Sequence, residues 1–294
     1  MILVCGTKRS GTSLWMQILK AAGLPIIGEA FPRRWRDKLG AANPRGFYES
    51  SLRHGIYYRT NPHPERGEFL FPDDTRWHAV KVFIPGLVRT DMAYIHRVIA
   101  TVRRRRDQVA SVRRLYALED AALREHDPEA RLPLRVPPSI EWWTEVYALL
   151  FDLTTRRHGA HVQSYEGLLA RPERVIARTL EWLGRGELAP SVAVVEPALQ
   201  TSGAPQTAAE AERLAALPDD DELAPPVAAL ADELYDVLHR GAALEPALLR
   251  AVNDAHVAMR PRITACYRAV REDIARRRAR ALDLLDRTGE GDDS

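Results

Sequence analysis

The sequence predicts an α/β fold in three layers, with a central parallel sheet flanked by helices and a helical C-terminal extension. Two observations support this prediction. Short apolar runs typical of buried strands alternate with helical patterns over the first two thirds of the chain. The last third is richer in Ala, Leu and Pro and carries amphipathic helical patterns. We therefore expect the 294 residues to form an α/β core over 1–200 and a helical extension over 201–294.

The first apolar run, residues 2–5, leads through a glycine-containing loop, residues 6–13, directly into a helical pattern. Backbone N–H groups in such a loop, with the positive end of the helix, suit the oxygens of a phosphate or sulfate. The spacing nearly satisfies the nucleotide-phosphate loop GxxxxGK[ST], but Thr12 stands where that motif requires Lys. The cations come earlier, at Lys8 and Arg9. The alternative is an ordinary strand-to-helix turn with incidental glycines.

Candidate ligand groups follow the next two predicted strands. A short strand near residues 25–27 precedes Glu29, whose carboxylate can face the loop. The strand at residues 78–83 carries Lys81 near its end, before a turn at residues 85–86. Ligands of open parallel sheets gather at the carboxyl ends of strands, so Lys81 is well placed for an anion. A surface lysine with its ammonium in solvent is an equal alternative.

The segment between these two strands predicts a turn at residues 43–49 and a helix that carries Leu52 and Ile56. Glu49 precedes that helix, where its charge favours a helix N-terminus. Residues 60–76 are rich in Pro, Gly, Asp and Glu and are expected to form a polar surface loop.

The clearest internal strand, residues 98–102, ends in the four arginines 103–106. Asp107 is expected to cap the following helix, which places Ser111 one turn into it. Arg103 and Ser111 can thus converge on one phosphate at a strand-to-helix junction. Arg103 directly follows a buried strand, where a counter-anion is needed, whereas the next two arginines are expected on a solvated face.

The remaining elements are mostly helical. A charged connection precedes a helix with an aromatic stripe, and a short strand follows it. Pro172 then opens a helix that Gly184 ends. The charged connection covers residues 119–138, the helix residues 140–153 and the short strand residues 161–166.

The extension shows helical patterns at residues 227–238 and 263–274, and Pro261 is expected to separate the later helix from the one before it. These helices can cap the core or pair two subunits as a homodimer. The last residues, 289–294, are expected to be disordered.

Bulk properties exclude several classes of protein. The net charge of +2 argues against a general nucleic-acid or membrane-surface binder. The two cysteines, Cys5 and Cys266, lack metal-ligand spacing and are expected to be reduced. The chain starts without a basic leader, and no stretch is apolar and long enough to span a bilayer. We therefore expect a cytoplasmic protein with no membrane span.

Four segments in the first two thirds of the chain resemble, in the same order, the sulfotransferases that use 3′-phosphoadenosine-5′-phosphosulfate (PAPS), especially their bacterial branch. The segments are residues 6–13, residues 43–49, Arg103 with Asp107 and Ser111, and residues 165–169 with Pro172. The resemblance implies a P-loop NTPase-like fold. It assigns Arg103 and Ser111 to the 3′-phosphate of PAPS and places Tyr165 near the adenine. It assigns the 5′-phosphosulfate to Thr7, Lys8, Arg9, Ser10, Gly11, Thr12 and Ser13.

Sulfuryl transfer requires a base for the acceptor's proton, cations for charge on the leaving oxygen, and an anchored donor. We expect Arg9 and Lys8, with the backbone N–H groups of residues 10–13, to meet that charge, with Lys81 assisting. The base is open among Glu29, Glu49 and His78. Glu29 is preferred because related enzymes of the protein-tyrosine branch place a glutamate just after a glycine at nearly this distance from the loop.

The resemblance makes PAPS a co-substrate, requires no metal, and predicts transfer to a hydroxyl or amine of a small-molecule or glycan acceptor. One alternative is a phosphate-loop kinase or nucleotide hydrolase, which needs a Lys in place of Thr12 and an Asp for Mg²⁺ after a core strand. A second alternative is a non-catalytic bisphosphonucleotide-binding module. Nucleic acid is not an expected partner, because the net charge is near neutral and no RNA motif occurs.

Overall fold

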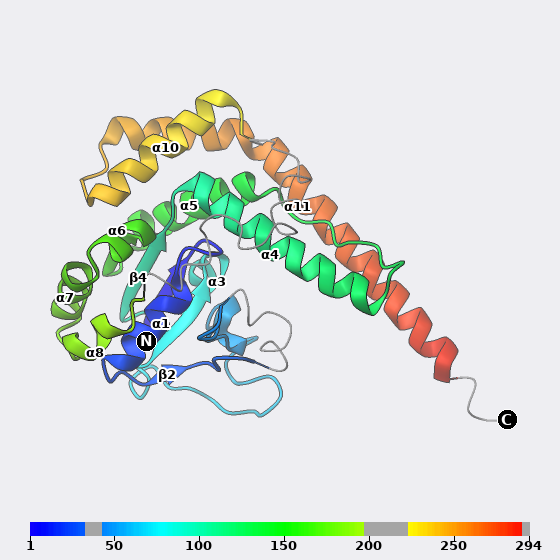
Figure 1. The fold of residues 1–294 in the computed structure, drawn as a ribbon, viewed down its shortest axis with the longest axis horizontal. Coiled ribbons are helices and arrows are strands. Elements are labelled where there is room, and N and C mark those ends of the chain that lie inside the picture. The colour runs from blue at the N-terminus through cyan, green and yellow to red at the C-terminus, as the bar shows by residue number, and fades with distance from the viewer. Residues whose placement is uncertain (33–42, 197–222, 290–294) are drawn as a thin grey trace.

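The computed structural model describes residues 1–32, 43–196 and 223–289. Its centre is a five-stranded sheet whose strands all run parallel, in the order β2-β3-β1-β4-β5 (Figure 1). The strands are β1 (Ile2–Gly6), β2 (Ile26–Ile27), β3 (Ala79–Phe83), β4 (Arg97–Val102) and β5 (Ala160–Ser164). The prediction of an α/β fold with a central parallel sheet is confirmed.

Helices connect the strands and cover the sheet. In chain order they are α1 (Thr12–Ala21), α3 (Ile84–Arg89), α4 (Arg105–His126), α5 (Pro138–Arg156), α6 (Tyr165–Ala170), α7 (Pro172–Leu183), α8 (Leu188–Ala193), α10 (Pro225–Arg240) and α11 (Pro246–Gly289). Two short 3-10 helices precede β3 and β4, η2 (Ser51–His54) and η3 (Met92–Tyr94).

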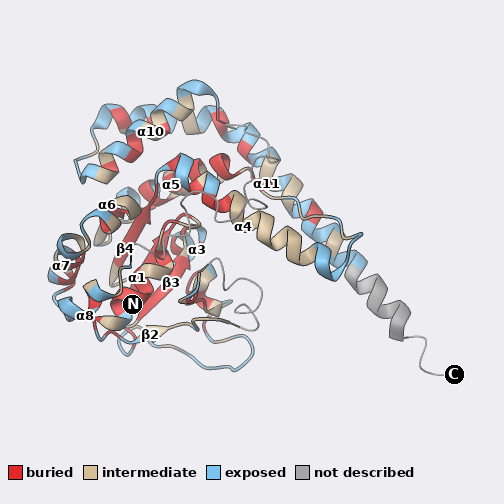
Figure 2. Cartoon of the chain, in the orientation of Figure 1, coloured by how far each residue is buried: buried red, intermediate tan, exposed pale blue. Residues whose placement is uncertain are grey.

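Alternate residues of β1 point to opposite faces of the sheet, and helices cover both faces. Leu3 and Cys5 belong to a buried cluster with side chains of α3, α5, α10 and α11. Ile2 and Val4 belong to a second cluster, with side chains of α1, α6 and α7. The central strands are therefore buried on both faces, as their near-continuous apolar runs predict (Figure 2).

Helix α4 begins before Asp107, so the prediction that Asp107 caps it is wrong. The N-cap residue is Arg104, and Asp107 lies in the first turn. Only two residues separate the last strand residue, Val102, from the helix, so the chain turns within the arginine run itself. Asp107 still stabilises this end, because its negative charge faces the positive end of the helix dipole.

Helix α4 also continues to His126, into the segment predicted as a connection. Glu119 and Asp120 on this last part pair with Arg135 of the returning chain, at 3.0 Å and 2.7 Å. The charges that indicate a loop in the sequence therefore join the helix to the connection that follows it.

Pro261 does not separate two helices, because it lies inside α11. A proline inside a helix removes one backbone hydrogen bond and costs about 3 kcal/mol. Met259 and Ile263, on either side of it, are both buried in the cluster that contains α5 and α10. This tertiary packing holds the helix together across the proline.

Two further predictions of local structure differ from the fold. The helix expected to carry Leu52 and Ile56 is only the single turn η2, because Gly55 ends it with a φ of 107°. The turn expected at residues 85–86 is instead the start of α3, where the fixed φ of Pro85 suits the first helical turn.

The extension packs on the α/β core. Side chains of α10 and α11 share one buried cluster with β4 and α5, and both helices lie along the side of the sheet that α5 covers (Figure 1). The predicted boundary at residue 200 and residues 290–294 lie outside the described residues. None of the helices in the described segments is long and apolar enough to cross a membrane.

Candidate anion-binding site

A cavity of about 300 Å³ lies at the carboxyl ends of β1, β3 and β4. Strand β1 is between β3 and β4, where the order of the strands reverses, and open α/β sheets bind ligands at this position. Most of the predicted site residues line the cavity: Thr7, Lys8, Arg9, Gly11, Thr12, Ser13, Lys81, Arg103 and Tyr165.

The loop between β1 and α1 is held in shape by Ser10. Its hydroxyl and its N–H both donate to the carbonyl of Thr7, at 2.7 Å and 3.1 Å, and its own carbonyl accepts from Thr101 Oγ1 at 2.7 Å. Ser10 is fully buried and does not belong to the lining. Its side chain and its backbone groups are thus used to shape the loop, and the predicted contact of Ser10 with a ligand is not formed in this arrangement.

Gly11 ends the loop as the N-cap residue of α1, with a φ of 93°. No side chain among the described residues caps this helix, so the N–H groups of its first turn face the cavity without a capping partner. The ring of Tyr165 lies against Gly11, and a Cβ at this position would be 2.5 Å from Tyr165 Cδ2. The glycine thus allows the loop and the tyrosine to form adjacent walls of the cavity.

Replacing Gly11 by alanine is expected to destabilise the fold more than replacing Gly23, which ends α1. Both glycines have positive φ, 93° and 85°, but no atom lies within 4 Å of a Cβ at Gly23. Gly23→Ala should therefore lower the free energy of unfolding only by the backbone cost, about 1–2 kcal/mol. Gly11→Ala should add about 1–3 kcal/mol for displacing Tyr165. Chemical denaturation measures both, and equal losses would contradict the contact with Tyr165.

Arg9 is one of the two cations of the loop that line the cavity. Its backbone is left-handed, with a φ of 65°, and its Nε donates to Ser111 Oγ at 3.2 Å. Burial, and then the nearby charge of Arg103, lower the pKa of Arg9 to about 10, so it is still protonated at neutral pH. Ser111, predicted to meet a phosphate together with Arg103, is thus bonded to Arg9 and does not belong to the lining.

Arg103 is buried at the end of β4 and donates from Nη1 to the carbonyl of Arg9 at 3.0 Å. Its guanidinium lies over the ring of Tyr165, 4.9 Å from the centroid, and its Nε is 3.9 Å from Glu166 Oε1. Burial lowers the pKa of Arg103. The half-buried guanidinium of Arg9 and the buried guanidinium of Arg103 thus share one side of the cavity, an arrangement that favours a bound anion.

The prediction that Arg104 and Arg105 lie on a solvated face is right for Arg104 and wrong for Arg105. The side chain of Arg104 is 53% exposed, as expected. Arg105 is instead buried, at 2% exposure, and its Nη2 pairs with Asp232 of α10 at 3.4 Å. The sequence contains no local signal for this pair, because the carboxylate comes from a helix far along the chain.

Lys81 points from β3 into the buried side of the cavity, so the alternative of a lysine with its ammonium in solvent is wrong. Its Nζ donates to Glu49 Oε1 at 2.7 Å, the carbonyl of Phe47 at 3.0 Å and Ser13 Oγ at 3.2 Å. Burial lowers the pKa of Lys81, and Glu49 opposes that shift. Lys81 therefore joins the loop to Glu49.

The three candidates for the base lie in different places. Glu49 is buried and lines the cavity. Glu29 is exposed and does not belong to the lining, although its backbone pairs with that of Glu49 in an isolated bridge. His78 precedes β3, at the amino end of the parallel sheet, away from the loop. Only Glu49 of the three is brought to the cavity.

Lys8 is engaged by two residues that the sequence does not indicate. Its Nζ donates to Glu141 Oε1 at 3.1 Å and to Tyr116 Oη at 3.0 Å. Burial alone lowers the pKa of Lys8, but these neighbours outweigh it and raise the pKa. Lys8 thus lines the cavity as a cation that Glu141 partly neutralises.

Comparison with protein-family models and with curated proteins gives no match. Within the described parts of the chain, no group of three or more His, Cys, Asp or Glu side chains is arranged to hold a metal ion. Cys5 is buried in β1, and Cys266 is half-buried in α11.

Proposed function

We propose that this protein is a PAPS-dependent sulfotransferase, which moves a sulfuryl group to a hydroxyl or amine of a small-molecule or glycan acceptor. One observation carries the proposal: Arg9, Arg103 and Lys81 come from three strand ends and reach the same cavity beside an uncapped helix N-terminus. Such a site suits a ligand with two separate anionic groups.

The donor supplies an activated sulfuryl group when it is bound. Arg9 and the N–H groups of the first turn of α1 would bind its phosphosulfate and stabilise charge on the leaving oxygen. Arg103 would bind the 3′-phosphate, and the ring of Tyr165, which supports Arg103, would lie near the adenine. Lys81 would add positive charge on the opposite side of the loop.

Glu49 is the base in this proposal, in place of Glu29. Its Oε1 accepts from Lys81, whereas its Oε2 is buried without a hydrogen-bond partner among the described residues, with Arg53 Nε at 3.8 Å. A buried carboxylate oxygen is rarely left without a donor, so Oε2 is suited to accept the proton of the acceptor group. The proton of the acceptor group would thus move to Glu49, which lines the cavity.

Calorimetry separates this function from that of a kinase or nucleotide hydrolase. We expect adenosine 3′,5′-bisphosphate to bind without a divalent cation and about tenfold or more tightly than AMP, because the 3′-phosphate adds charge-assisted hydrogen bonds. Tighter binding of ATP with Mg²⁺ would contradict the proposal. A radiolabelled-sulfate transfer assay over a library of phenols, sugars, amines and lipids then tests for an acceptor, and bisphosphate binding without any transfer would favour the non-catalytic module.

Three further expectations are part of this proposal and stay predictions. They are the absence of a metal requirement, a cytoplasmic location and a homodimer through the C-terminal helices. Turnover measured at increasing chelator concentration tests the absence of a metal requirement. The molar mass in solution tests the homodimer.

A further inference from the structure

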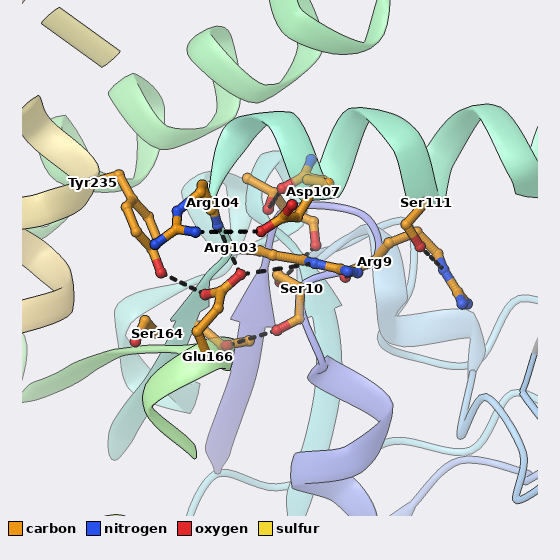
Figure 3. A network of polar contacts seen from close by, with 12 residues as sticks. Arg9, Ser10, Arg103, Arg104, Asp107, Ser111, Ser164, Glu166 and Tyr235 are labelled. Atoms are coloured by element: carbon orange, nitrogen blue, oxygen red, sulfur yellow. Dashed lines mark hydrogen bonds and ion pairs between the residues drawn. The ribbon is translucent and has the colours of Figure 1, made fainter. Parts of the chain in front are cut away.

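Helix α10 reaches the arginine junction between β4 and α4 from the C-terminal part of the chain (Figure 3). The hydroxyl of Tyr235 donates to Glu166 Oε2 at 2.6 Å, and its ring lies 5.6 Å from the guanidinium of Arg104. Tyr235 is 1% exposed. One turn later, His239 Nδ1 is 2.7 Å from Ser164 Oγ. Helix α10 thus holds the segment that carries both Ser164 and Glu166.

Glu166 connects α10 to the junction. Its Oε1 accepts from the backbone N–H of Arg104 at 3.1 Å and lies 3.9 Å from the Nε of Arg103. On the other side, Trp142 Nε1 donates to the carbonyl of Arg103 at 2.9 Å. The backbone on both sides of the Arg103–Arg104 peptide is therefore fixed by side chains of other helices.

We infer that Tyr235 and Glu166 are positioning residues, which orient Arg103 for the 3′-phosphate of the donor. This inference rests on the proposed function. Glu166 contacts the guanidinium of Arg103 only at 3.9 Å. The orientation of that guanidinium therefore depends on what holds the Glu166 carboxylate in place. Tyr235 binds its second oxygen and thereby directs the first oxygen toward the junction. Helix α10 is in this way part of the donor site.

The phenol of Tyr235 is suited to this task. Burial, and then the hydrogen bond to Glu166, raise the pKa of Tyr235, so the hydroxyl stays protonated and remains a donor at neutral pH. Asp232, three residues earlier on α10, pairs with Arg105 and holds the helix against the same junction. The contacts of α10 with the arginine junction are thus formed before any ligand binds.

Tyr235→Phe tests the inference, because it removes the hydroxyl and keeps the buried ring. We expect affinity for adenosine 3′,5′-bisphosphate to fall about tenfold, the effect of one hydrogen bond to a charged group. Affinity for AMP, which lacks the 3′-phosphate, should stay unchanged. Glu166→Gln should give the same selective loss, and the double variant should lose less than the two single losses combined. A purely structural role would weaken both nucleotides together.

Tyr147→Phe is the matched control. It removes a hydroxyl that bonds Asn253 Oδ1 at 2.9 Å between α5 and α11, away from the junction. We expect it to bind both nucleotides like the wild type. Equal losses for the two nucleotides in Tyr235→Phe and Glu166→Gln, or no loss in either variant, would overturn the positioning role. A wild-type protein without preference for the bisphosphate would instead overturn the proposed function, and this role with it.

Discussion

Arg9→Ala is expected to lower kcat by about 10²–10³-fold, the usual cost of losing one group that stabilises charge in a transition state. Its affinity for adenosine 3′,5′-bisphosphate should fall less than that of Arg103→Ala. Arg9 belongs to the loop at the proposed phosphosulfate, where charge develops during transfer, whereas Arg103 would bind a phosphate whose charge does not change. Steady-state kinetics and calorimetry on both variants measure this difference.

Arg97→Ala is a suitable control for the loss of one arginine. Arg97 begins β4, at the opposite end of the strand from Arg103, and its guanidinium lies over the ring of Trp182. We expect kcat close to that of the wild type. If Arg9→Ala raised KM and left kcat unchanged, Arg9 would bind the donor equally in the ground state and the transition state, and its proposed catalytic role would be wrong.

Glu49→Gln is expected to lower kcat by about 10²–10⁴-fold, because it removes the base and keeps the size of the side chain. The amide oxygen can still accept from Lys81, so the wall of the cavity should keep its shape.

Glu29→Gln addresses the competing candidate. The side chain of Glu29 is exposed and is not part of the lining, so its loss should change kcat far less than the loss of Glu49. A reversed result, with Glu29→Gln inactive and Glu49→Gln active, would assign the base to Glu29 and require a rearrangement of residues 28–30 on binding. Thermal unfolding of both variants shows whether either change acts through stability.

The three central strands, β1, β3 and β4, were predictable because each is a short, mostly apolar run, buried on both faces of a parallel sheet. The location of the cavity was predictable to the same extent, since the carboxyl ends of such strands meet at one edge. Residues directly after a strand, such as Arg103, or near its end, such as Lys81, must lie there. The order of the strands was not predictable, because it depends on which side of β1 each connection takes.

Charges were the least predictable feature of the site. In the sequence Arg105 looks like a surface cation and Lys8 looks like a ligand of an anion, yet Asp232 and Glu141 pair with them. Glu49 looked like a residue at a helix N-terminus, whereas it is the buried partner of Lys81. A pair of this kind leaves no local pattern, because its two members come from segments distant in the chain.

The sequence by itself determined the sheet, the loop and the cations that follow the strands, because periodicity and glycine spacing are local properties of the chain. The tertiary structure decided which carboxylate reaches the cavity, how far α11 continues through Pro261, and that α10 holds the arginine junction. These outcomes depend on burial and on the pairing of distant charges, and both exist only after the helices have packed on the sheet.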